Sequence, residues 1–181
     1  MNDVPSRSTR RSPPARLGTL PVAATVMTSV LALYMLLVLF GNITDFGTNR
    51  DFVRHVLAMD TTFHDPHVTW RAITNPALQD GVYVCVIIGE ALTTAVLVYA
   101  VVLWRSAFRR SSTFERARQV ATLGLLTGGF IVIGGEWFAM WQSTQWNGLQ
   151  PALQNTILAA FALVLVQLPS RHWEPGGSGP A

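Results

Sequence analysis

The chain has 181 residues, of which 50% are hydrophobic and only 13% are charged. A soluble globular domain carries about twice that share of charged residues, so the composition argues against a water-soluble protein. All thirteen basic residues are arginine, and the formal net charge is +3. Because these arginines lie near the ends of apolar segments and no base-reading motif accompanies them, we expect no nucleic-acid partner.

Four apolar segments account for about half of the chain and predict an all-α, polytopic membrane protein. A hydrocarbon core about 30 Å thick requires about 20 helical residues at a rise of 1.5 Å each. Three of the segments reach this length, and the last is slightly short. In chain order the predicted transmembrane segments are 20–40, 82–104, 120–141 and 152–168.

These segments predict one membrane domain, residues 20–168, built as a four-transmembrane-helix bundle. A disordered basic tail, residues 1–19, precedes it, and a second tail, residues 169–181, follows it. Residues 41–81 form a long loop between the first two segments. A loop of this length exceeds what two neighbouring helices need, so we expect it to be structured.

The distribution of arginine predicts the orientation. Ten of the thirteen arginines lie in the two tails or in the connection between the second and third segments. The long loop has only Arg50, Arg54 and Arg71. Under the positive-inside rule, both tails are then cytoplasmic and the loop is external. The sequence thus predicts a multi-pass protein of the bacterial inner (plasma) membrane, with the lipid bilayer as its first partner.

The outer loop is predicted to be partly helical. Apolar residues recur at helical spacing between residues 52 and 59, beside basic residues, which is typical of a short helix lying on a membrane face or over a bundle. A further short helix is predicted from Asp65 to Ile73. The expected helix starts are Thr48 or Asn49 as N-cap with Asp51 in the first turn, then Asp65-Pro66, then Asn75-Pro76 for the second transmembrane helix.

Two carboxylates fall inside the predicted transmembrane helices. At 1.5 Å per residue, Glu90 lies about 12 Å and Glu136 about 8 Å from the outer ends of their helices. A lone charge there costs a few kcal/mol on insertion scales, so each must be protonated, paired or reached by water. The nearest predicted partners are the loop residues Arg54, Arg71 and His55.

Two interpretations of these five residues remain open. In the first, Glu90, Glu136, Arg71, Arg54 and His55 form a ligand or proton site that faces the outside. In the second, arginine–glutamate pairs lock the loop onto the bundle and have no further role. The residue types do not decide between the two interpretations, because nothing in the sequence specifies a ligand.

Four tryptophans are predicted to gather at the outer interface: Trp137, Trp141 and Trp146, with Trp70 from the loop. Tryptophan is enriched at headgroup level, so an anchoring belt is the simplest explanation. The alternative is a pocket lined by the helical face that carries Glu136.

The remaining sequence patterns concern helix packing, metal binding and catalysis. Gly124 and Gly128 form a GxxxG pair that favours close helix packing within the bundle. Because no predicted transmembrane segment contains histidine and Cys85 is the single cysteine, we expect no metal site and no cofactor. No catalytic motif occurs, so we expect no enzymatic activity.

Several blocks of the chain also resemble a known family. They are Asn42–Asn49, Phe52–Thr61, Trp70–Ile73, Glu90, Glu136–Ser143 and Trp146–Gly148. In these blocks, and over about residues 20–170, the chain resembles the bacterial predicted small integral membrane proteins, domain of unknown function 2165. The resemblance implies a four-helix membrane protein and carries over no activity.

Two classes of function are therefore predicted. The first is a non-enzymatic membrane component that binds a membrane protein partner, a lipid or a small ligand at its outer face. The second is a small proton-linked transporter or a membrane subunit of a redox complex that uses Glu90 and Glu136. Four transmembrane helices without a repeat are few for a stand-alone transporter, which favours the first class.

Overall fold

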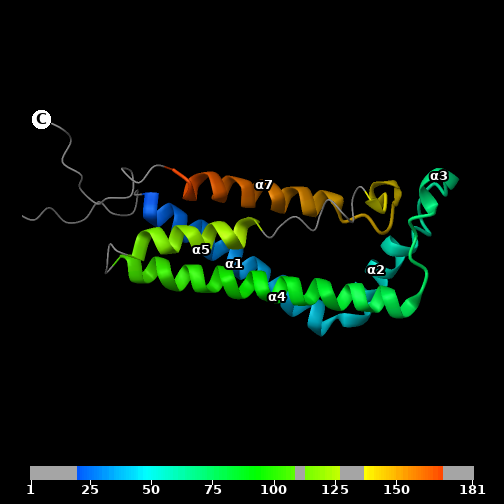
Figure 1. The fold of residues 1–181 in the computed structure, drawn as a ribbon, viewed down its shortest axis with the longest axis horizontal. Helices are drawn as coiled ribbons and strands as arrows, with labels where there is room; N and C mark the ends of the chain where they lie inside the picture. Colours follow the sequence, from blue (N-terminus) through cyan, green and yellow to red (C-terminus); the bar gives the residue numbers. More distant parts are fainter. Residues whose placement is uncertain (1–19, 109–112, 127–136, 169–181) are drawn as a thin grey trace, which may run out of the picture.

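The computed structural model describes residues 20–108, 113–126 and 137–168. Every regular element within these ranges is helical, which confirms the predicted all-α class (Figure 1). The elements in chain order are α1 (Leu20–Thr44), α2 (Phe46–Ala58), α3 (Pro66–Thr69), α4 (Pro76–Ala107), α5 (Phe114–Leu126), the 3-10 helix η4 (Met140–Gln142) and α7 (Leu149–Val166).

Three of the described helices are long and apolar enough to cross a membrane: α1, α4 and α7, with 25, 32 and 18 residues. The predicted third segment, 120–141, begins within α5, and residues 127–136 lie outside the described part of the chain. The prediction extends this segment too far toward residue 141. Phe138 and Ala139 are not α-helical, and Ala139 adopts a left-handed φ of 50°.

The long helices lie side by side along the long axis of the molecule, and α2 and α3 gather at one end (Figure 1). Helix α4 packs against α1 and α5, and α7 packs against the same two helices. Many of the buried side chains between them are alanine, including Ala24, Ala100, Ala121 and Ala162. Small residues let membrane helices approach closely, so packing rather than a large hydrophobic core holds this bundle together.

Gly124 of α5 allows a close approach to α4. A Cβ atom built on it would lie 2.7 Å from Leu97 Cδ2 and 3.0 Å from Leu97 Cγ on α4. This contact fits the packing interpretation of the GxxxG pair, whereas Gly128 lies outside the described residues.

The outward faces of the bundle are apolar. Phe40 on α1, Leu92 on α4 and Val164 on α7 are each more than 60% exposed. In water such surfaces would be an aggregation liability, whereas hydrocarbon solvates them at no cost. The arrangement of side chains thus agrees with lipid as the surrounding solvent.

At the other end of the molecule from Leu20, two segments pack together, and we call residues 45–75 and 137–148 the cap. Their shared core consists of Leu57, Met59, Phe138 and Ala139. Polar contacts also join the segments, because Thr61 Oγ1 donates to Ser143 Oγ at 2.9 Å. The cap is therefore one packed unit rather than two separate loops.

The cap helices confirm one predicted start and correct another. Asp65 caps α3 by accepting from His67 N at 2.8 Å, as expected. Helix α2 begins at Phe46, ahead of both expected caps, Thr48 and Asn49, so Asp51 is not in its first turn. Asn49 Nδ2 instead donates to the carbonyl oxygen of Asp45, just before α2, and to that of Gly41 in α1.

Helix α3 is shorter than predicted, ending at Thr69 instead of Ile73. The reason is a tertiary contact: Ile73 N donates to Leu57 O of α2 at 2.8 Å. The segment after α3 is thus held against α2 by a backbone hydrogen bond and is not helical. It leads to Asn75, whose side chain accepts from Ala77 N and Leu78 N and starts α4 at Pro76 as predicted.

Candidate functional site at the cap

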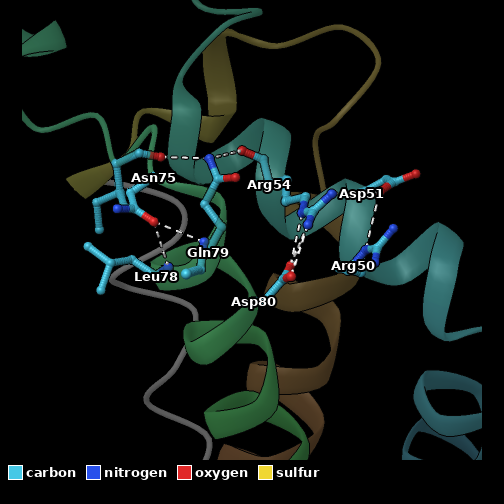
Figure 2. Close-up of polar contacts among 9 residues, drawn as sticks. Arg50, Asp51, Arg54, Asn75, Leu78, Gln79 and Asp80 are labelled. Carbon is cyan, nitrogen blue, oxygen red and sulfur yellow. Dashed lines mark hydrogen bonds and ion pairs between the residues drawn. The ribbon is translucent and has the colours of Figure 1, made fainter.

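An arginine–aspartate pair attaches α2 to the first turns of α4 (Figure 2). Arg54 Nε donates to Asp80 Oδ1 and Nη2 donates to Asp80 Oδ2, both at 2.9 Å. The buried Gln79 adds a second link, because its Nε2 donates to Ile73 O at 2.7 Å. The guanidinium fork matches the carboxylate, but both side chains are partly exposed, so the pair stabilises the junction by about 1 kcal/mol or less.

Glu90 lies within α4 and is bound by an amide from α1. Asn42 Nδ2 donates to Glu90 Oε1 at 2.8 Å and to Oε2 at 2.7 Å. The carbonyl oxygen of Asn42 in turn accepts from the hydroxyl of the buried Tyr83 at 2.8 Å. The Glu90 carboxylate of α4 is thus linked to α1 by one neutral group, the Asn42 amide.

This arrangement corrects the expected pairing of Glu90 with an arginine of the loop. Arg54 is engaged by Asp80, and in the described part of the chain Glu90 has no basic partner. The lock between loop and bundle exists, but it uses Asp80 at the end of α4 instead of the glutamate deeper in that helix. The second glutamate, Glu136, lies outside the described residues.

Arg71 lies beside two tryptophans. Its Cζ is 4.9 Å from the ring centroid of Trp137 and 5.7 Å from that of Trp70, within the range of cation–π attraction. Its Nη1 donates to Trp137 O at 3.3 Å. Among the described residues, no carboxylate lies within ion-pair distance of this guanidinium.

His55 belongs to a third group. Its Nδ1 lies 2.7 Å from Asp60 Oδ2, and its ring stacks on Trp146 with centroids 4.5 Å apart and an interplanar angle of 13°. The stack joins the two segments of the cap. His55 therefore contributes to the cap itself and contacts neither Arg54 nor Arg71 through any described hydrogen bond.

The four predicted tryptophans all lie in the cap, and they pair with aromatic rings across its two segments. Trp70 and Trp137 meet edge to face with centroids 6.0 Å apart, and Phe63 meets Trp141 in the same way at 6.1 Å. Trp70 is 69% exposed and Phe63 is 72% exposed. The cap thus presents aromatic faces outward while its own core stays packed.

The predicted site residues therefore form separate groups: Arg54 with Asp80, Arg71 with two tryptophans, His55 with Asp60, and Glu90 with Asn42. Sequence reasoning missed the partners of all four. One signal in the sequence pointed to the partner of Glu90: Asn42 is a polar residue just after the end of an apolar segment. Within the described ranges, no group of three or more His, Cys, Asp or Glu side chains is placed to hold a metal ion.

Helices of spanning length, an apolar outer surface and an aromatic cap at one end define a small integral membrane protein. A family model described as predicted small integral membrane protein (DUF2165) matches residues 20–169. The chain belongs to this family, which confirms the resemblance seen in its sequence. No curated protein matches the chain, and no solved structure matches it. The family description assigns no activity.

Proposed function

We propose that this protein spans the bacterial inner membrane four times with both termini in the cytoplasm, and that it is a non-enzymatic component whose outer cap binds a partner protein, a lipid or a small ligand. The end of α4 and the start of α7 lie at opposite ends of the molecule (Figure 1). The chain between them must run the length of the bundle, which supports a fourth crossing. The end of α4 and the start of α5 lie at the end of the molecule opposite the cap (Figure 1). Arg105 is in the last turn of α4, and Arg116 and Arg118 are near the start of α5, which supports the orientation.

Reporter fusions test the number of crossings and the orientation. Alkaline phosphatase fused after Arg71 is expected to be active, and fusions after Arg118 or after Leu168 are expected to be inactive, because only an external reporter folds in oxidising surroundings. A reporter active only in the cytoplasm, fused at the same positions, is the control. Three crossings would instead place the two termini on opposite sides of the membrane.

The observation that carries the binding function is the construction of the cap. Its inner side is fixed to the bundle by the Arg54–Asp80 pair and by Gln79, whereas its outer side exposes paired aromatic rings. Aromatic residues with little rotational freedom dominate binding surfaces because they bury a large area at low entropic cost. A fixed surface of this kind favours recognition over transport.

Photocrosslinking in native membranes tests this function. A photoreactive phenylalanine at Phe63 of the cap is expected to give discrete, saturable adducts with a protein, lipid or small molecule. The matched control is Phe161 on α7, which is 62% exposed but lies on the apolar face of the bundle. That position is expected to give only diffuse adducts with bulk lipid. Equal patterns at both positions would reject the cap as a binding surface.

The second candidate is a proton-linked transporter or redox-complex subunit that uses Glu90 and Glu136. The observation that favours it is the position of Glu90 in a spanning helix with only neutral hydrogen-bond partners in the described part of the chain. Purified protein in vesicles that contain a pH-sensitive dye distinguishes the candidates. If the wild-type protein moves protons and Glu90→Gln abolishes this movement, the second candidate is favoured. If the wild-type protein moves no protons, the second candidate is rejected.

A further inference from the structure

We propose that Arg71, together with Trp70 and Trp137, forms a binding site for a phosphate group. The phosphodiester of a lipid headgroup and free inorganic phosphate share this chemistry and are the two sources. The inference deepens the proposed binding function and rests on it, because it names the ligand class and the residues of the cap that recognise it.

The charge of Arg71 is the first argument. The cap contains two other arginines, and each has a carboxylate: Arg50 Nε lies 3.6 Å from Asp51, and Arg54 Nη2 lies 2.8 Å from Asp80. Among the described residues Arg71 has none. Its Nε is buried without a hydrogen-bond acceptor, as is that of Arg50, so the two arginines differ in the carboxylate that only Arg50 has nearby. An arginine without a carboxylate partner at the surface of the cap can bind an external anion.

The geometry around the guanidinium is the second argument. The Trp70 and Trp137 centroids are 5.7 and 4.9 Å from Arg71 Cζ but only 6.0 Å from each other. If the rings covered opposite faces, their centroids would be much farther apart. Both rings therefore lie toward one side of the guanidinium. Nε is buried and Nη1 makes a single long bond to Trp137 O, so the second N–H of Nη1 and both N–H groups of Nη2 remain for a ligand.

The site is held in place by the cap, and this is the third argument. The indole Nε1 of Trp70 donates to His67 O at 3.1 Å, and Arg71 N donates to Val68 O at 3.2 Å. Trp137 precedes Phe138, which is buried in the cap core. Binding then requires little ordering of side chains, because the groups are already in position.

The donors of this site suit a phosphate group, and its depth in the membrane places it near phosphate groups. A guanidinium presents parallel N–H donors that match two oxygens of a phosphate group. Exposed tryptophan is enriched at the depth of lipid headgroups, so the same residues that anchor the cap lie where phosphodiesters are concentrated. The site thus combines a planar donor for the phosphate with aromatic rings for the adjoining apolar region.

Native mass spectrometry of the purified full chain in detergent tests the proposal. The probes are phosphatidylglycerol and diacylglycerol, which share acyl chains but differ in the phosphate, with added sodium phosphate or sodium chloride as competitor. Wild-type protein is expected to bind phosphatidylglycerol in preference to diacylglycerol. Displacement by millimolar phosphate but not chloride would identify free phosphate as the source, and resistance to it would identify the lipid headgroup.

Variants assign the binding to the residue. Arg71→Gln is expected to weaken phosphatidylglycerol binding about tenfold, because it removes charge-assisted hydrogen bonds. The matched control, Arg50→Gln, removes the same charge from the same cap and is expected to change binding less than about twofold. Arg71→Lys keeps the charge without the planar fork and is expected to lose about threefold, which provides a test if Arg71→Gln does not fold.

Several results would overturn the inference. Equal binding of phosphatidylglycerol and diacylglycerol without displacement by phosphate would do so, as would equal losses in Arg71→Gln and Arg50→Gln, or wild-type binding by Arg71→Lys. Such results beside saturable adducts at Phe63 would reject the phosphate site and leave the proposed binding function intact. Equal adducts at Phe63 and Phe161 would reject the binding function, whatever the lipid result.

Discussion

Asn42→Leu is expected to lower the free energy of unfolding by about 2 kcal/mol, because it leaves the carboxylate of Glu90 without its amide donor inside a spanning helix. Asn42 Nδ2 supplies both hydrogen bonds that Glu90 receives from α1, at 2.8 and 2.7 Å. A group that loses its partner in hydrocarbon retains the full cost of desolvation. Reversible unfolding in detergent or in lipid bicelles measures the effect.

A double-mutant cycle provides the control for this prediction. Glu90→Leu alone leaves Asn42 unpaired and is expected to cost less, since an amide is cheaper to bury than a carboxylate. The double variant Asn42→Leu/Glu90→Leu is expected to be more stable than Asn42→Leu alone, because two apolar groups replace the polar pair between α1 and α4. Additive losses would show that the two side chains do not act as a pair.

Gly124→Val is expected to destabilise the bundle interior by about 2–3 kcal/mol. A Cβ at this position would lie 2.7 Å from Leu97 Cδ2, 3.0 Å from Leu97 Cγ and 3.3 Å from Val96 Cγ1. Leu97 is 2% exposed, so other protein atoms surround it. The valine must then displace the Leu97 side chain within a packed interior or push α5 away from α4, and either change disturbs contacts between the two helices.

A matched substitution at another glycine separates packing from helix propensity. Gly89→Ala, in the interior of α4, would place its Cβ with nothing within 4 Å and is expected to be neutral or slightly stabilising. Gly124→Ala is expected to be destabilising, and Leu97→Ala is expected to relieve part of that loss in the double variant. If Gly124→Ala and Gly89→Ala behaved alike, the close approach of α5 to α4 would not matter for stability.

The helix starts show what local sequence predicted correctly. Asn75 and Asp65, each followed by proline, cap α4 and α3 at the expected positions. Both signals are local, because a side-chain oxygen reaches a backbone N–H two residues along the chain. The start of α2 was predicted wrongly. There α1 continues to Thr44, so the chain re-enters a helix at Phe46 before it reaches Thr48 or Asn49.

The partners of the charged residues show what local sequence could not give. Arg54 meets Asp80 across 26 residues, and Asn42 meets Glu90 across 48. The sequence predicted a lock between an arginine and a glutamate, whereas the structure pairs Arg54 with the aspartate Asp80. Which carboxylate an arginine reaches depends on how α2 lies against α4, and no spacing rule in the sequence encodes that contact.

The helical structure of this protein and its residence in a membrane follow from local sequence, because a long apolar segment without charge forms a helix that hydrocarbon can solvate. The residues that begin α3 and α4 follow from local sequence as well. Three features do not: residues 45–75 and 137–148 join into a cap, Asn42 binds Glu90, and Arg71 lies beside two tryptophans. Each of these depends on side chains far apart in the chain, whose meeting is set by the packing of whole helices.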